Sequence, residues 1–123
     1  MATQNKTPAE YLALYAEGWT KGDVDTILAA TAPGYTFDDP QESEPVSREQ
    51  FGAYFETLKV DIRLNQGNPA PESFMLLSEV MVQERPSGLV AWCWWEIPEL
   101  VEGAGLIHVG PQGVTSEKIA YYQ

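Results

Sequence analysis

The spacing of apolar residues changes about halfway along this chain, from the three- and four-residue spacing of helices to the alternation of strands. Residues 7–22, 23–33 and 47–59 each predict a helix, and each begins at a Thr, Asp or Ser that can cap the first turn. Thr7 with Glu10 and Ser47 with Gln50 also have the spacing of a capping box. This order predicts an α+β fold in which a sheet packs against helices.

Six segments have the pattern of strands. The short aromatic stretch of residues 35–39 lies between the second and third helices, and VDIRLNQ at 60–66 alternates apolar and polar residues. Four further strands are predicted over 73–84, 88–97, 104–110 and 116–122, while NPAPE at 68–72 is typical of a loop. No repeat or linker interrupts the chain, so residues 1–123 are expected to form a single domain whose curved sheet leaves a concave side.

Composition excludes several classes of function. Seven Lys and Arg against eighteen Asp and Glu give a net charge of −11, which repels phosphate backbones and anionic lipid surfaces, so no nucleic acid or membrane partner is expected. One His and one Cys without ligand spacing predict no metal site, and we expect no cofactor. The single Cys93 and an N-terminus without a secretion signal predict a cytoplasmic location.

Two aspartates end the first predicted strand in YTFDDPQESEP. Strand alternation places Tyr35, Phe37 and Asp39 on one face and Asp38 on the other, so Asp39 follows the aromatic side chains inward. Two interpretations of Asp39 remain open on the residues alone. It is either a carboxylate held at the mouth of an apolar pocket or the cap of a solvated turn before Pro40.

Tyr15 and His108 are the other polar candidates. Tyr15 shares a helical stripe with Leu12 and Trp19, so its ring faces inward, either as a core tyrosine or as a hydrogen-bond donor in a pocket. His108 is the only histidine and stands in the apolar strand LIHVG, where it is either a satisfied core residue or a pocket residue.

The tryptophan-rich strand AWCWWEI has one face that is expected to line a dry pocket wall. Which face does so depends on the loop that leads to His108. An even number of loop residues places Cys93 and Trp95 on the face of the histidine, and an odd number places Trp92, Trp94 and Glu96 there. A plain core or a dimer interface is an equally open role for these tryptophans.

The run YAEGWTKGDVDTILAATAPGYTFDDPQESEPVSREQF, residues 15–51, resembles the nuclear transport factor 2-like superfamily, which includes ketosteroid isomerases, SnoaL-like polyketide cyclases and limonene epoxide hydrolases. The resemblance extends over nearly the whole chain. It implies a cone-shaped fold of cystatin-like or ketosteroid isomerase-like topology, in which a curved mixed or antiparallel sheet wraps around three N-terminal helices. It also implies a homodimer formed through the outer face of the sheet.

The same resemblance implies roles for individual residues. Asp39, directly before the proline, corresponds to the general base of the isomerases, and Tyr15 to the donor that stabilises the oxyanion. His108 stands where the isomerases have a protonated aspartate; a neutral imidazole can still donate one hydrogen bond. The expected pocket residues are Trp19, Phe37, Tyr54, Phe55, Trp92 and Trp94.

Three functions remain open from the sequence. The first is a cofactor-independent isomerase, cyclase or lyase that uses an Asp general base on a small apolar carbonyl compound. An epoxide hydrolase is less favoured, because that chemistry resembles an Asp-Arg-Asp arrangement and no arginine stands beside an aligned acid. The second is a non-catalytic carrier or sensor of a small hydrophobic ligand, and the third is a dimeric interaction module with a filled pocket.

Overall fold

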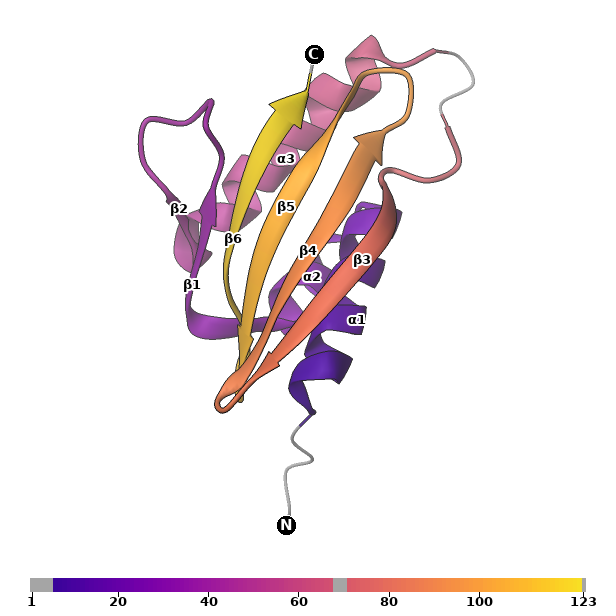
Figure 1. The fold of residues 1–123 in the computed structure, drawn as a ribbon. Coiled ribbons are helices and arrows are strands. Elements are labelled where there is room, and N and C mark those ends of the chain that lie inside the picture. The colour runs from indigo at the N-terminus through magenta and orange to yellow at the C-terminus, as the bar shows by residue number, and fades with distance from the viewer. Residues whose placement is uncertain (1–5, 68–70, 123) are drawn as a thin grey trace.

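The computed structural model describes residues 6–67 and 71–122, in which three helices cover one face of a six-stranded sheet (Figure 1). The helices are α1 (Pro8–Lys21), α2 (Val24–Ala29) and α3 (Arg48–Asn65). The strands are β1 (Thr31–Asp38), β2 (Val46–Ser47), β3 (Leu76–Arg85), β4 (Gly88–Ile97), β5 (Val101–Gly110) and β6 (Gly113–Tyr122). This arrangement confirms the predicted α+β fold.

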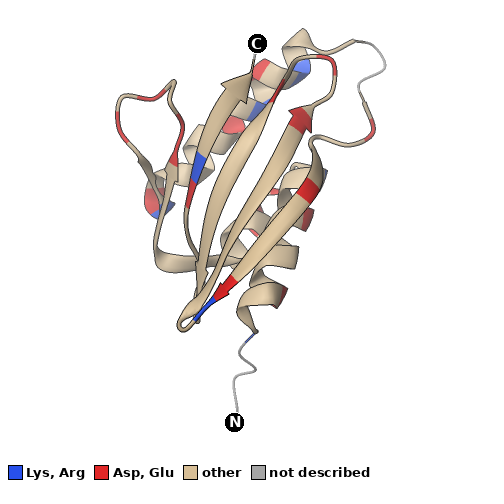
Figure 2. Ribbon diagram, viewed as in Figure 1, with Lys and Arg blue, Asp and Glu red and all other residues tan. Residues whose placement is uncertain are grey.

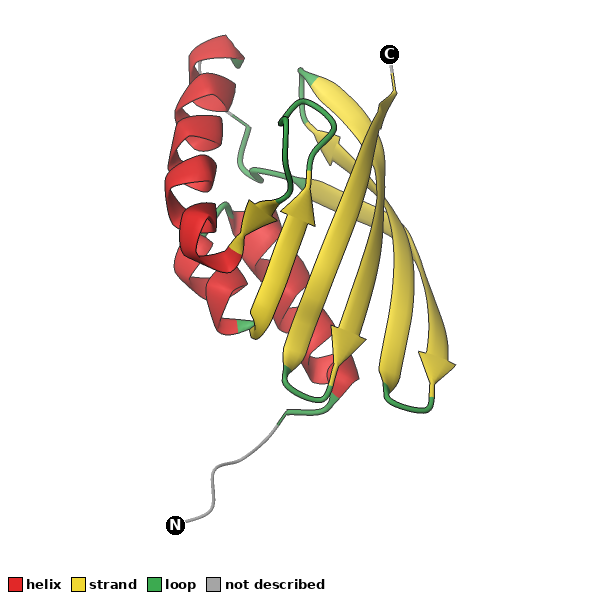
Figure 3. Cartoon of the chain, turned by 90° about the vertical axis from the view of Figure 1, so that its left-hand side faces the viewer, coloured by secondary structure: helices red, strands yellow, loops and turns green. Residues whose placement is uncertain are grey.

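The sheet is mixed and has the strand order β2-β1-β6-β5-β4-β3. β1 is parallel to β6, and the other neighbours are antiparallel. Figure 3 shows the long strands curling over the helices without closing into a barrel. The concave face of the sheet is therefore the side that holds the core.

The predicted helix starts are confirmed at the level of single hydrogen bonds. Thr7 Oγ1 accepts from the Glu10 backbone N–H at 3.1 Å, and the Glu10 carboxylate accepts from the Thr7 N–H at 2.8 Å. Ser47 and Gln50 form the corresponding capping box of α3. Gly22 caps the C-terminus of α1, and its φ of 69° is the left-handed conformation that glycine adopts without strain.

The strand predicted over residues 60–66 is wrong, because α3 continues through Asn65. Ile62 is buried, whereas Val60 and Leu64 are 56% and 77% exposed. Ile62 lies seven residues after Phe55 and eleven after Phe51, which keeps all three on one helical face. The alternation that suggested a strand is thus a by-product of one buried and two exposed apolar residues. Residues 68–70 of the predicted loop lie outside the described residues.

An aromatic cluster fixes α1 and α3 on β1. The ring of Trp19 from α1 lies 5.5 Å from Phe37 of β1 and 5.9 and 5.4 Å from Phe51 and Phe55 of α3, measured between centroids. Each such pair contributes about 0.5–1.5 kcal/mol beyond the burial of its surface.

No helix in the described part of the chain is long and apolar enough to cross a membrane.

Candidate functional site

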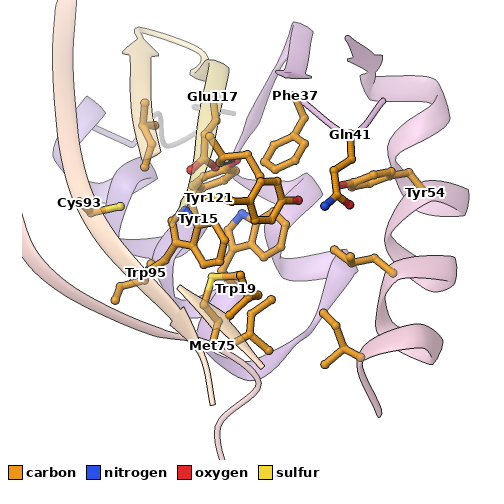
Figure 4. Close-up of a pocket in the computed structure, with 17 residues that line it drawn as sticks. Tyr15, Trp19, Phe37, Gln41, Tyr54, Met75, Cys93, Trp95, Glu117 and Tyr121 are labelled. Atoms are coloured by element: carbon orange, nitrogen blue, oxygen red, sulfur yellow. Dashed lines mark hydrogen bonds between the residues drawn. The ribbon is translucent and has the colours of Figure 1, made fainter. Parts of the chain in front are cut away.

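A cavity of about 210 Å³ lies between the helices and the concave face of the sheet (Figure 4). Its wall is mainly aliphatic and aromatic, and none of the described residues that line it is Lys, Arg or His. Such a wall suits a small, mainly apolar ligand. The lining residues are Tyr15, Trp19, Phe37, Gln41, Tyr54, Leu58, Ile62, Met75, Leu77, Cys93, Trp95, Ile97, Val101, Ile107, Glu117, Ile119 and Tyr121.

Glu117 of β6 is the one carboxyl group among the described lining residues, and it is 6% exposed. The Tyr15 hydroxyl donates to Glu117 Oε1 at 2.5 Å, and the hydroxyls of Tyr15 and Tyr35 are 2.7 Å apart. Burial raises the pKa of Glu117 to about 7, although the Tyr15 hydrogen bond opposes this shift. Burial also raises the pKa values of Tyr15 and Tyr35, so both remain protonated donors.

A glycine on the neighbouring strand makes room for this carboxyl group. Glu117 pairs with Ile107 of β5, and Gly105 lies diagonally across, two residues earlier. A Cβ atom on Gly105 would lie 2.4 Å from Glu117 Oε2, too close for any real contact. Cys93 of β4 pairs with Gly105, and burial raises the pKa of its thiol to about 12, so this part of the wall carries no thiolate.

Asp39 is 3% exposed and does not line the cavity, but three lining residues donate to it. Its Oδ2 accepts from the Tyr54 hydroxyl at 2.6 Å, and its Oδ1 accepts from the Tyr121 hydroxyl and the Gln41 backbone N–H, both at 2.9 Å. Burial, reinforced by Asp39, raises the pKa values of both tyrosines and keeps them as donors. Asp39 therefore joins α3, β6 and the turn after β1.

Several predicted pocket residues lie where the sequence placed them. Tyr15, Trp19, Phe37 and Tyr54 all line the cavity. Phe55 is fully buried but lies in the aromatic cluster and not in the cavity wall.

The prediction that His108, Trp92 and Trp94 line the pocket is wrong. The loop between β4 and β5 has an odd number of residues, 98–100, so the three side chains share one face of the sheet. That face points away from the helices: Trp92 and Trp94 are 38% and 37% exposed, and His108 is also exposed. Cys93 and Trp95, which alternate with them, line the cavity instead.

Glu117 and Tyr121 are the site residues that sequence reasoning missed. Glu117, Ile119 and Tyr121 alternate along SEKIAYY, the same signal that placed Asp39 inward on β1. No cluster of three or more His, Cys, Asp or Glu that could hold a metal ion occurs within residues 6–67 and 71–122.

Two comparisons, with protein-family models and with curated proteins, give no match for this sequence. Solved structures do resemble the fold. A "putative ketosteroid isomerase" from Parabacteroides distasonis is 12% identical with a TM-score of 0.69, over 96% of this chain and 89% of that one. A SnoaL-like protein of unknown function from Burkholderia thailandensis is 17% identical with a TM-score of 0.65, over 94% and 95% of the two chains.

A third structure is a "putative polyketide cyclase" from Xanthomonas campestris pv. campestris, 16% identical with a TM-score of 0.61, over 94% of this chain and 90% of that one. Proteins described as nuclear transport factor 2-like and as having a cystatin-like fold are also similar. At these identities the similarity is one of fold and not of activity. The chain therefore has the cone-shaped α+β fold of the nuclear transport factor 2-like, SnoaL-like and ketosteroid isomerase-like proteins.

Proposed function

We propose that this protein binds a small, mainly apolar carbonyl compound in the cavity and transfers a proton to or from it without a cofactor. Glu117 is the acid–base residue of this proposal. The observation that carries it is a carboxyl group with a pKa near 7 in the wall of a cavity whose other described lining residues are uncharged. A general acid–base group works best when its pKa lies near the working pH.

The chemistry needs a base and a donor. Ionised Glu117 removes a proton from the carbon beside the carbonyl, and the electron pair of the C–H bond moves to form the enolate, whose oxygen gains negative charge. Protonated Glu117 then returns the proton to the same or another carbon. Candidate donors to the oxygen are the indole N–H groups of Trp19 and Trp95, since both residues line the cavity and neither N–H has a hydrogen-bond partner among the described residues.

Orientation of the carboxyl group supports the proposal. Tyr15 fixes Oε1, and Tyr35 can donate to the Tyr15 oxygen when Tyr15 donates to Glu117. No side-chain hydrogen bond to Oε2 is found among the described residues, and in this proposal Oε2, which lies over Gly105, is the oxygen that meets the ligand. Neighbours described as a ketosteroid isomerase and a polyketide cyclase have the same fold, which makes the fold compatible with this chemistry without assigning it.

Asp39 is the competing candidate for the base. Asp39 does not line the cavity, and both of its oxygens already accept hydrogen bonds from side chains of the wall, Tyr54 and Tyr121, which favours Glu117 as the base. Turnover of a β,γ-unsaturated ketone distinguishes the two carboxyl groups. If Glu117 is the base, Glu117→Gln loses roughly a hundred- to ten-thousandfold in rate and Asp39→Asn loses about tenfold or less. The opposite ranking would assign the role to Asp39.

A non-catalytic carrier or sensor is the second function that the cavity supports. The tyrosine hydroxyls of the cavity wall already donate to Glu117 and Asp39. A wall whose polar groups are paired in this way can hold a ligand without reacting with it. Trp19 and Trp95 report ligand binding through their fluorescence. Saturable quenching by aromatic ketones without turnover favours a carrier, and a flat response counts against both functions.

The outer face of the sheet supports a homodimer and, more broadly, an interaction role. We infer that Met81, Trp92, Trp94 and Tyr122 contact a second copy, since all four are between 37% and 65% exposed. Figure 2 shows that the middle of β4 and β5 carries no charged residue.

A reducing cytoplasm is the location that we propose, because the sequence has one cysteine and it is a buried free thiol.

A further inference from the structure

We propose that Asp39 controls access to the cavity by holding Tyr54 of α3 and Tyr121 of β6 together at one end of its mouth. This role rests on the ligand cavity of the proposed function and is independent of proton transfer within it. It assigns Asp39 a structural task at the mouth in place of a direct one in the chemistry.

The hydrogen bonds around Asp39 connect the two walls of the cavity. Among the described residues, the side-chain hydrogen bonds that relate α3 to β6 all pass through the Asp39 carboxylate. In Figure 4, Tyr54 projects from the helix, Tyr121 from the sheet, and Gln41 lies beside them. The Gln41 backbone N–H fixes the same carboxylate from the turn after β1. A change at Asp39 therefore changes how firmly α3 is held against the sheet.

The exposure of the lining residues shows where the cavity meets solvent. Tyr15, Trp19, Cys93 and Glu117, which form the interior, are buried. The partly or fully exposed lining residues lie along the gap between α3 and the sheet and include the residues that Asp39 binds; they are Gln41, Tyr54, Leu58, Leu77, Val101, Ile119 and Tyr121. A ligand that reaches Glu117 passes through this gap, and Asp39 limits its width at the end nearest Tyr54.

The strength of the contacts suits a gate that opens only rarely. Both tyrosine hydroxyls donate to a charged acceptor, at 2.6 and 2.9 Å. Such bonds are stronger than those between neutral groups, and loss of one corresponds to roughly a tenfold or larger change in an equilibrium between closed and open states. Removal of either hydroxyl should therefore leave the apolar wall in place and raise the population of the open state.

Rates of ligand binding test this inference. Quenching of tryptophan fluorescence by acetophenone, followed by stopped flow, gives the association and dissociation rate constants for the parent protein, Tyr54→Phe and Tyr121→Phe. Tyr11→Phe is the matched control, since Tyr11 lies on α1 and does not line the cavity. We expect both rate constants to rise about tenfold in the two mouth variants, with the Kd changed by less than about threefold.

Three outcomes would overturn the inference. Rate constants within twofold of the parent in both mouth variants would show that the Asp39 hydrogen bonds do not limit access. A weaker Kd with an unchanged association rate would make the tyrosines ligand contacts instead of a gate. An equal rise of both rate constants in Tyr11→Phe would mean that loss of a tyrosine hydroxyl loosens the whole fold, and not the mouth in particular. Faster binding in the two mouth variants without any turnover in the parent would support the gate. That result would count only against the proposed proton transfer.

Discussion

Glu117 carries the proposed proton transfer. Ionisation of its carboxyl group costs free energy in the folded state, because the group is buried in an apolar wall. Its pKa rises from 4.5 to about 7 on folding, so the folded state binds more protons than the unfolded state between these values. This residue's contribution to the free energy of unfolding is therefore largest below about pH 4.5 and falls as the pH rises through 7. The total fall is about 3 kcal/mol.

Urea denaturation at a series of pH values tests this sign. The difference in the free energy of unfolding between the parent protein and Glu117→Gln is expected to change by about 3 kcal/mol between pH 4.5 and 8, with the variant gaining relative to the parent as the pH rises. Parallel pH profiles for the two proteins would mean that Glu117 titrates normally and that its burial has no energetic consequence.

Gly105 is expected to matter as the residue that leaves space for Glu117. Gly105→Ala adds a methyl group 2.4 Å from Oε2, which displaces the carboxyl group and costs about 1–3 kcal/mol of stability. Gly34→Ala is the control, because nothing lies within 4 Å of its added Cβ. The midpoint of the Glu117 titration, followed by carbon NMR, should shift in Gly105→Ala and not in Gly34→Ala. An unchanged midpoint in both would remove Gly105 from the positioning of Glu117.

Single residues were predictable where the type of the residue agreed with its place in a repeating pattern, and they were missed where type and pattern disagreed. Tyr15, Trp19, Phe37 and Tyr54 were found because each belongs to an apolar stripe whose inward face the sequence reveals. Glu117 was missed because an acid in a strand is usually solvated, although its alternation with Ile119 carried the signal.

At the scale of elements, two helical glycines should respond to the same change in opposite directions. A Cβ on Gly18 of α1 would lie 2.7 Å from Ile27 of α2, so Gly18→Ala should cost about 1–3 kcal/mol and disturb the contact between the helices. Gly52 of α3 has nothing within 4 Å, so Gly52→Ala should stabilise by about 0.5–1 kcal/mol. Urea denaturation measures both. A Gly18→Ala protein as stable as the parent would show that α1 and α2 can separate freely.

Helix starts were the most predictable elements, because Thr7, Asp23 and Ser47 satisfy backbone groups within four residues of themselves. The end of α3 was not, since Val60 and Leu64 are apolar yet exposed and so imitate a strand. The face of His108 was not predictable either. Loop parity relates β5 to β4, but which face of that pair meets the helices depends on the packing of the whole sheet.

At the scale of the whole molecule, acidity and the exposed sheet face have opposing effects on self-association. The net charge of −11 repels a second copy, whereas burial of Trp92 and Trp94 favours one. We expect a dimer that tightens as salt screens the repulsion, and Trp94→Glu should dissociate it. Sedimentation equilibrium at low and high salt measures this. A parent protein that stays monomeric at both salt concentrations would contradict the proposed interface.

The most direct test of the central claim is hydrogen exchange at carbon. Acetophenone is incubated in deuterated water with the parent protein, Glu117→Gln and Asp39→Asn, and mass spectrometry follows deuterium uptake beside the carbonyl. Glu117 as the acid–base residue predicts uptake with the parent and with Asp39→Asn, and a loss of roughly a hundredfold or more with Glu117→Gln. Uptake with Glu117→Gln equal to that of the parent would contradict the account.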